Sequence, residues 1–167
     1  MTLKRCFPPV VNQDTRVLVL GSLPGEISLA HNQYYAHKQN RFWSLVGDVI
    51  EIDLVGQQYP DRLQTLLEHR IGLWDVVAEA RRTGSLDSNI RNHASNDLIA
   101  LVETLPNLAA IAFNGGTAAK IGERALGECP KQFRIFKLPS SSPAHASVPY
   151  PAKLLAWREL RDVLTST

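Results

Sequence analysis

Apolar residues along the chain gather in four short runs that are typical of buried β-strands. The clearest run, Arg16–Ser22, is rich in Val and Leu and closes at Gly21. A central strand covered on both faces shows such a continuous apolar run instead of alternation. Two further runs, Leu108–Phe113 and Phe133–Leu138, have the same character, and Ile71–Val77 is a weaker fourth. We therefore predict four strands.

Between these runs, apolar residues recur at three or four positions, which predicts amphipathic helices. The predicted helices are Phe42–Ile50, Arg62–His69, Asn96–Leu105, Thr117–Leu126 and Lys153–Leu164. Strands that alternate with helices favour a parallel sheet with right-handed crossovers. The pattern thus predicts an α/β fold of three layers, α/β/α, around a central, mainly parallel four-stranded sheet.

Length and composition favour one globular domain that spans residues 1–167. The hydrophobic fraction of 44% supports a substantial core without help from disulfides. No apolar stretch approaches the roughly 18 to 20 residues of a membrane span, and the N-terminal residues lack the apolar core of a signal peptide. We expect a cytoplasmic protein, and we expect it to be a monomer.

Two observations limit the chemistry of a site. Cys6 and Cys129 are too few for a four-thiolate metal site and belong to no C-x-x-C pair, so we expect reduced thiols and no metal. The net charge of +2 does not by itself indicate a nucleic-acid ligand, because phosphate binding depends on where the cations cluster.

Three loops at the carboxyl ends of the predicted strands are the candidate ligand loops. They begin at Gly21, Asn114 and Pro139, and they are rich in Gly, Ser, Asn or Pro. Ligands of open α/β sheets bind at this edge. Gly21-Ser-Leu-Pro-Gly25 lacks the Lys-Ser/Thr ending of a P-loop and the third glycine of a dinucleotide fingerprint, so taken alone it fits a ligand loop or a plain turn equally well.

The segment that follows carries more information. Tyr34-Tyr-Ala-His-Lys-Gln-Asn-Arg-Phe-Trp43 contains four aromatic rings, a His, an Asn and two cations. A long connection of this composition more often has a function than serves only to join two elements.

These residues resemble the uracil-DNA glycosylase superfamily. Gly-x-x-Pro-Gly, followed by an aromatic residue and Ala-His-x-x-Asn-Arg-Phe-Trp, is similar to the first motif of its mismatch-specific and deoxyinosine-specific branches. A second motif of the superfamily follows the last central strand, where this chain has Leu138-Pro-Ser-Ser-Ser-Pro-Ala-His-Ala-Ser147. Its Ser-Pro-Ala core looks like the deoxyinosine, or hypoxanthine-DNA, glycosylase branch.

The resemblance assigns roles to residues of the first motif. It implies that Tyr35 stacks on an extruded base, with Ser22 and Leu23 beside it. Leu23 stands where many relatives have an Asp or Asn that handles the water, and its side chain cannot do so. The resemblance therefore implies that Asn40 holds the water, although an Asn before a helix is otherwise usually a cap.

Asp75 resembles the position at which the uracil branch reads the base edge with an Asn. A carboxylate only accepts hydrogen bonds, so it suits the N1–H of hypoxanthine and opposes adenine, whose N1 is an acceptor. A salt-bridged or capping Asp at a strand end is the alternative. Asn114 is expected to cap a helix, with a place in the base pocket as the second interpretation.

The remaining candidates are assigned to leaving-group assistance and to DNA. His145 is expected to donate to the departing purine or to contact a phosphate. Val148 or Tyr150 is expected to be the wedge that fills the gap of the flipped base. The candidate DNA contacts are Gly25, His37, Lys38, Arg41, Lys137, Ser140, Ser141, Ser142 and Ser147.

The sequence thus predicts a monofunctional DNA glycosylase that flips deoxyinosine from DNA and hydrolyses its N-glycosidic bond. No metal or organic cofactor is implied, and neither motif offers a Lys for a Schiff base with the sugar. One alternative is a glycosylase for uracil or for G:U and G:T mismatches. Another is a DNA-damage or nucleotide-binding module that has kept the fold and lost the chemistry.

Overall fold

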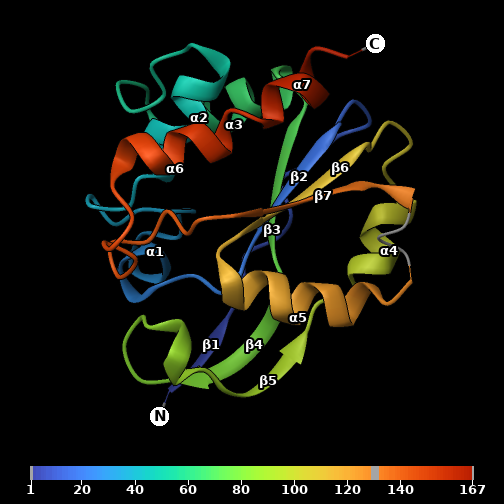
Figure 1. The fold of residues 1–167 in the computed structure, drawn as a ribbon. Helices are drawn as coiled ribbons and strands as arrows, with labels where there is room; N and C mark the ends of the chain where they lie inside the picture. Colours follow the sequence, from blue (N-terminus) through green and yellow to red (C-terminus); the bar gives the residue numbers. More distant parts are fainter. Residues whose placement is uncertain (1, 129–131, 167) are drawn as a thin grey trace.

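The computed structural model describes residues 2–128 and 132–166, and Cys129 therefore lies outside the described residues. Its centre is a parallel four-stranded sheet in the order β3-β2-β6-β7 (Figure 1). These strands are β2 (Val17–Gly21), β3 (Ile71–Asp75), β6 (Ala110–Asn114) and β7 (Arg134–Leu138). All four strands were predicted, and so was their parallel pairing.

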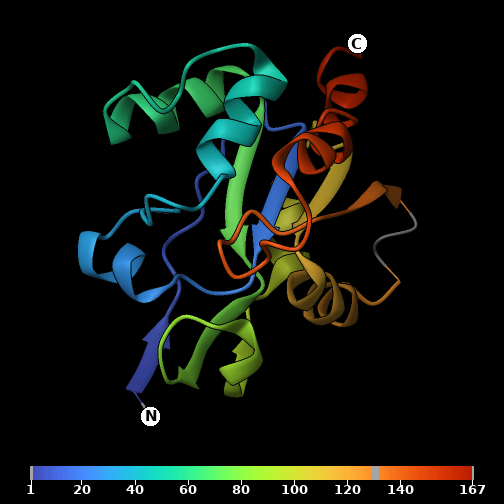
Figure 2. The ribbon, with the colours of Figure 1, turned by 60° about the vertical axis from the view of Figure 1, so that its left-hand side comes forward.

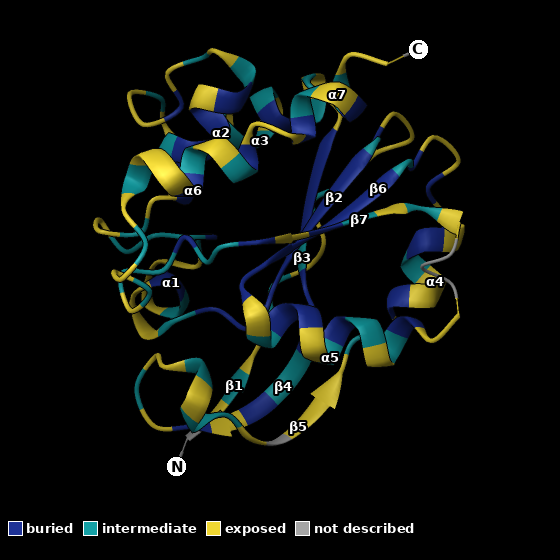
Figure 3. Cartoon of the chain, viewed as in Figure 1, coloured by how far each residue is buried: buried dark blue, intermediate teal, exposed yellow. Residues whose placement is uncertain are grey.

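The strands are apolar throughout because helices cover both faces of the sheet. Val17 and Val19 of β2 belong to one buried cluster, whereas Leu18 and Leu20 belong to the cluster on the other face. Successive side chains of a strand point to opposite faces, so only an unbroken apolar run fills both clusters. Figure 3 shows β2 and β6 buried along their length. The predicted three-layer α/β/α arrangement is confirmed.

Four helices pack on one face of the sheet and two on the other. The first set is α2 (Phe42–Ile50), α3 (Tyr59–Glu68), α6 (Tyr150–Trp157) and α7 (Leu160–Leu164); the second is α4 (Leu98–Glu103) and α5 (Gly116–Leu126). The bounds of α2 are those predicted. Helix α3 begins three residues earlier than predicted, since Pro60 is well suited to a first helical turn.

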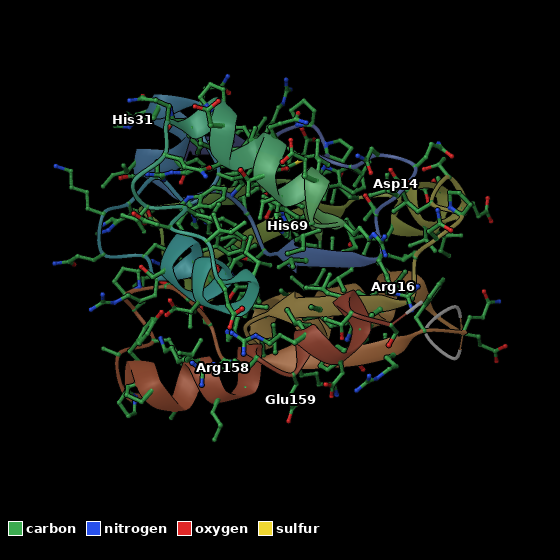
Figure 4. All side chains as sticks on the ribbon, turned by 90° about the horizontal axis from the view of Figure 1, so that it is seen from above. Asp14, Arg16, His31, His69, Arg158 and Glu159 are labelled. Carbon is green, nitrogen blue, oxygen red and sulfur yellow. The ribbon has the colours of Figure 1, made fainter. Side chains whose placement is uncertain are left out.

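Two other helices correct the sequence prediction. The predicted helix Asn96–Leu105 is the shorter α4, because the Asp97 side chain accepts from the Ala100 N–H and so caps its start. The predicted helix Lys153–Leu164 is two helices that meet at Arg158 and Glu159, which Figure 4 labels. Arg16 Nε, at the start of the sheet, donates to the Val163 carbonyl at 2.6 Å and fixes α7 there.

A second, antiparallel sheet was not predicted. It has the order β1-β4-β5, formed by β1 (Thr2–Arg5), β4 (Val77–Arg82) and β5 (Arg91–Ser95). The predicted strand Ile71–Val77 therefore divides after Asp75 into β3 and β4. The loop between β4 and β5 contains the short 3-10 helix η1 (Asp87–Asn89), and the short α1 (Glu26–His31) follows the loop after β2.

The register of the parallel sheet brings the strand ends together. Gly21 of β2 pairs with Asp75 of β3, and Asn114 of β6 pairs with Leu138 of β7. After β2 the chain continues to β3 on one side of the sheet, and after β6 it continues to β7 on the opposite side. The direction in which strands are added therefore reverses between the neighbours β2 and β6. Such a switch point is where open α/β sheets bind ligands.

None of the described helices has the length and hydropathy needed to cross a membrane. Cys6 carries a free thiol.

Candidate active site

A cavity of about 370 Å³ lies at the carboxyl edge of the parallel sheet. Loops after β2, before α6 and between β4 and β5 surround this side of the molecule, which faces the reader in Figure 2. The cavity has room for a purine, whose burial in such a site is typical of enzymes that flip a base. The predicted residues that line it are Ser22, Leu23, Gly25, Tyr35, His37, Asn40, Asp75, Asn114, Ser140, Ser141, Ser142 and His145.

The floor of the cavity is formed around Gly21. A Cβ atom at this position would lie 2.7 Å from Asp75 Oδ1 and 2.8 Å from the Tyr35 hydroxyl oxygen, so glycine is what allows both groups to approach the end of β2. We call Gly21, Tyr35, Asp75 and Asn114 the floor. Three of its members end strands, and strands are the most rigid supports that the fold offers.

Asp75 is a buried carboxyl group with an uncommitted oxygen. Its residue is 3% exposed, and among the described residues Oδ2 has no hydrogen-bond partner. Burial, and next the nearby charge of Asp87, raise the pKa of Asp75 to about 7, while Arg82 acts in the opposite direction. A buried polar atom without a partner costs about 1 to 3 kcal/mol, which a ligand that donates a hydrogen bond would recover.

Tyr35 is the floor residue whose backbone conformation is strained. Its φ of 54° lies in the left-handed region, which residues other than glycine seldom adopt. One face of the ring stacks on Phe42, with centroids 3.9 Å apart and an interplanar angle of 11°. The hydroxyl is buried without a partner among the described residues, and burial raises the pKa of Tyr35. Because Phe42 covers one face, a base can stack only on the other.

Asn40 lies just before α2 but is not its N-cap, which is Arg41 without a side-chain cap bond. Asn40 Oδ1 accepts a hydrogen bond from the Phe42 N–H at 2.9 Å. Asn40 also lines the cavity, and an amide oxygen has two lone pairs, so the bond from Phe42 leaves it able to accept from a water. The bond from the Phe42 N–H fixes the direction of the amide, which is what a group that positions a water requires.

Asn114 corrects a sequence prediction. It does not cap α5, whose N-cap is Gly115 with no side-chain cap bond. The Asn114 amide instead pairs with Ser141: its Nδ2 donates to Ser141 Oγ and its Oδ1 accepts from the Ser141 N–H, both at 2.9 Å. The pairing joins the end of β6 to the second motif, and it leaves the backbone N–H of the buried Ser141 committed to Asn114 instead of a phosphate.

Several predicted DNA contacts lie outside the cavity. Lys38, Arg41 and Ser147 are exposed and do not line it. Arg41 lies over the Tyr150 ring, with its guanidinium carbon 5.6 Å from the centroid. Lys137 Nζ is 2.9 Å from Glu123 Oε1 of α5 and lines a different cavity, so the structure does not place it in this site.

Neither predicted wedge residue lines the cavity. Val148 is half-buried, and Tyr150 is the first residue of α6, where its hydroxyl donates to Asp48 Oδ2 at 2.5 Å. A wedge enters the base stack and not the base pocket, so its assignment to Val148 or Tyr150 stays a prediction.

The loop between β4 and β5 supplies a wall that the sequence did not reveal. Ser85, Leu86, Asp87 and Ser88 all line the cavity. Ser22 Oγ donates to Asp87 Oδ1 at 2.6 Å, and burial raises the pKa of Asp87, while the bond from Ser22 lowers it. No motif marks this loop, and it reaches the site only because the antiparallel sheet carries it there.

Arg82 holds this wall from within the protein. It is 0% exposed; its Nε donates to the Gly84 carbonyl at 2.8 Å and its Nη2 donates to the Pro24 carbonyl. Burial lowers the pKa of Arg82, and the charges of Asp87, Glu26 and Asp75 oppose this effect. The guanidinium thus joins the loop after β2 to the loop after β4 and compensates part of the negative charge of the floor.

The fold and the site define a class: an α/β protein with a cavity large enough for one base, lined by an aromatic ring, a buried acceptor and an amide. Residues 8–161 match the family model described as the uracil DNA glycosylase superfamily. The chain belongs to this superfamily, and it is accordingly a DNA glycosylase, a hydrolase of N-glycosyl bonds.

Two curated relatives are named hypoxanthine DNA glycosylase. The protein of Methanosarcina barkeri is 43% identical over 112 residues, which cover 67% of this chain and 71% of that protein. The protein of Methanosarcina acetivorans is 41% identical over 145 residues, which cover 86% of this chain and 89% of that protein.

A solved structure has the same fold. It is a solution NMR structure of a candidate uracil DNA glycosylase from Methanosarcina acetivorans, with a TM-score of 0.87 and 38% identity. The similarity covers 99% of this chain and 100% of that one.

Proposed function

We propose that this glycosylase removes hypoxanthine from DNA and leaves an abasic site. The observation that carries the proposal is the buried Asp75 carboxyl group, whose Oδ2 has no partner among the described residues and which lies on the floor of the cavity. As a carboxylate it accepts the N1–H of hypoxanthine, and adenine has no hydrogen at N1 to offer. Two relatives named for hypoxanthine support the same substrate.

In the proposed reaction, deoxyinosine leaves the base stack and its base enters the cavity. The free face of Tyr35 stacks on the base, which contributes roughly 1 to 3 kcal/mol. Asp75 accepts from N1–H, and this contact selects the deaminated purine over adenine.

Bond cleavage then requires a water and help for the leaving base. Asn40 directs the water toward C1′ of the sugar, and His145, which lines the same cavity, donates to the departing purine. The glycosidic bond breaks through an oxocarbenium-like state, so a neutral amide that positions the water is sufficient. The electron pair of the C1′–N9 bond goes to the purine, the water oxygen bonds to C1′, and the proton that this water releases replaces the one that His145 gives to the purine.

We also propose that the enzyme acts as a monomer and in the cytoplasm. Its DNA contacts would come from the exposed Lys38 and Arg41, together with Ser140 and Ser142 of the second motif.

The deciding experiment is incubation with duplexes that contain one hypoxanthine, one uracil, or neither, followed by alkali to break the strand at abasic sites. We expect cleavage of the hypoxanthine duplex first and none of the undamaged control. Cleavage of none of the three duplexes would contradict the proposal.

Uracil excision is the second candidate. It is favoured by the segment from Tyr35 to Trp43, which the mismatch branch shares, and by the description of the solved structure. Faster cutting of the uracil duplex in the same experiment would establish it in place of hypoxanthine.

A further inference from the structure

Arg82 of β4 is a buried cation that forms no ion pair within residues 2–128 and 132–166. Its Nε and Nη2 donate to the carbonyls of Gly84 and Pro24, and Nη1 is buried with no hydrogen-bond partner among the described residues. Carbonyl oxygens carry no net charge, so the positive charge of the guanidinium remains inside the protein. Because burying an unpaired charge is costly, we looked for the groups on which this charge acts.

The loop after β2, residues 21–25, joins Arg82 to two carboxyl groups of the cavity. Its first residue pairs with Asp75 in the register of the parallel sheet. Its second, Ser22, donates from Oγ to Asp87 Oδ1 at 2.6 Å. The carbonyl that accepts from Arg82 Nη2 belongs to the same loop. One short loop therefore holds a buried cation and two carboxyl groups close together, and both carboxyl groups line the cavity.

The two charges nearest to Asp75 act on its carboxyl group in opposite directions. Burial is the main cause that raises the pKa of Asp75; the negative charge of Asp87 raises it further, whereas Arg82 lowers it. The other titratable groups that act on Asp75 or line its cavity are Tyr34, Tyr35, Cys6, His37 and His145. Burial raises the pKa of the two tyrosines and of the thiol, so these three groups are uncharged near pH 7.

We propose that the charge of Arg82 keeps Asp75 ionised beside Asp87, so that Arg82 is a positioning residue for base selection that acts through Asp75. This role rests on the base selection of the proposed function. An ionised Asp75 accepts from the N1–H of hypoxanthine, whereas a protonated one brings a second hydrogen to the same contact. Without Arg82, two neighbouring carboxyl groups would ionise less readily, and selection would require a higher pH.

The test measures the ionisation of Asp75 directly. Carbon-13 NMR follows the aspartate carboxyl carbons from pH 4 to 9, and the Asp75 signal is assigned by its loss in Asp75→Asn. Arg82→Gln keeps an amide donor without the charge and should raise the Asp75 midpoint by about one pH unit. Asp87→Asn keeps an acceptor for Ser22 and should lower the midpoint by a similar amount. Arg81→Gln, at the exposed neighbour on β4, is the matched control and should leave the midpoint unchanged.

Hypoxanthine excision is measured over the same pH range in single turnover. The pH at which the rate is half-maximal should move with the Asp75 midpoint in each variant. An Asp75 midpoint that Arg82→Gln leaves unchanged or lowers would overturn the proposal, and so would a rate profile that does not follow the midpoints.

Arg82→Lys serves if the loss of the buried guanidinium prevents Arg82→Gln from folding. A lysine ammonium keeps the charge without the planar fork of donors, so the Asp75 midpoint should stay at the wild-type value. A raised midpoint in folded Arg82→Lys would contradict the role of the charge. Failure of the proposed function is a different result, because wild type would then leave the hypoxanthine duplex intact while the midpoints still shift.

Discussion

The floor of the cavity and its rim differ in how the fold supports them. The floor consists of Gly21, Tyr35, Asp75 and Asn114, three of which end strands of the parallel sheet. The rim consists of loop residues, such as Leu86 and His145, that are partly or largely exposed. Buried groups on strands tolerate little displacement, whereas exposed side chains can change without disturbing the core. We infer that the floor selects the base and that the rim engages the DNA.

The largest effect is expected where the two regions meet, at Asn40. Asn40→Ala should lower turnover about 10² to 10³-fold, because the water loses its acceptor, while DNA binding remains close to wild type. The measurement is single-turnover excision together with a binding titration.

The Asn40→Ala change also removes the side-chain acceptor of the Phe42 N–H at the start of α2, so a matched variant is needed. Asn40→Asp keeps an acceptor for the Phe42 N–H and for the water, and it should retain more activity than Asn40→Ala. Equal losses in both variants would indicate that the amide itself, not its acceptor oxygen, is required.

Gly21→Ala tests the floor by displacing Asp75 or Tyr35 instead of removing either side chain. The new methyl group would lie 2.7 Å from Asp75 Oδ1 and 2.8 Å from the Tyr35 oxygen, so one of these groups must move. We expect excision to fall about 10 to 100-fold, since a displacement of about 1 Å in a site has effects of that order. Gly116→Ala is the control, because its added Cβ meets nothing within 4 Å. Similar rates for both variants would show that the floor is not sensitive to position.

The pH dependence of base selection tests the charge on the floor. Burial raises the pKa of Asp75 to about 7, so the carboxyl group is ionised above this pH and protonated below it. The ionised form accepts from hypoxanthine, whereas the protonated form can donate to N1 of adenine. The ratio of hypoxanthine to adenine excision should therefore fall as the pH is lowered from 8 to 6. A ratio that is constant over this interval would remove Asp75 from base selection.

The same pKa also affects folding. Because the pKa of Asp75 is higher in the folded protein than in the unfolded chain, the charged form is disfavoured by folding, and its cost appears as the pH rises from about 4 toward 7 and persists above it. At neutral pH the ionised Asp75 therefore lowers the stability of the folded protein, and the same ionised group is the acceptor for the base.

The smallest effect is expected at the rim. Arg41→Ala should weaken DNA binding only a few-fold, with base preference unchanged. The slope of log Kd against log salt concentration should fall by about one, because one phosphate contact is lost. Lys137→Ala is the matched control, since Lys137 pairs with Glu123 away from the site. A change in base preference in Arg41→Ala would contradict the division between floor and rim.

The sequence predicted the parallel sheet and much of the floor because local patterns encode them. The unbroken apolar run of β2 requires burial on both faces, and the first motif follows directly from it. The antiparallel sheet was missed because β4 (VAEARR) and β5 (RNHAS) carry charges and few β-branched residues. The burial of Arg82 depends on carbonyls of two separate loops, which no local pattern reveals.

The direction of individual side chains also could not be predicted from the sequence. Asn114 stands where a helix cap is expected, yet it turns toward Ser141, a partner 27 positions along the chain.

The most direct test of the floor is competition between hypoxanthine and adenine duplexes at pH 8, with wild type and Asp75→Asn. An amide can both accept from hypoxanthine and donate to adenine, so the ratio of the two excision rates should fall at least about tenfold in Asp75→Asn. An unchanged ratio, even with slower excision of both bases, would contradict the assignment of base selection to Asp75.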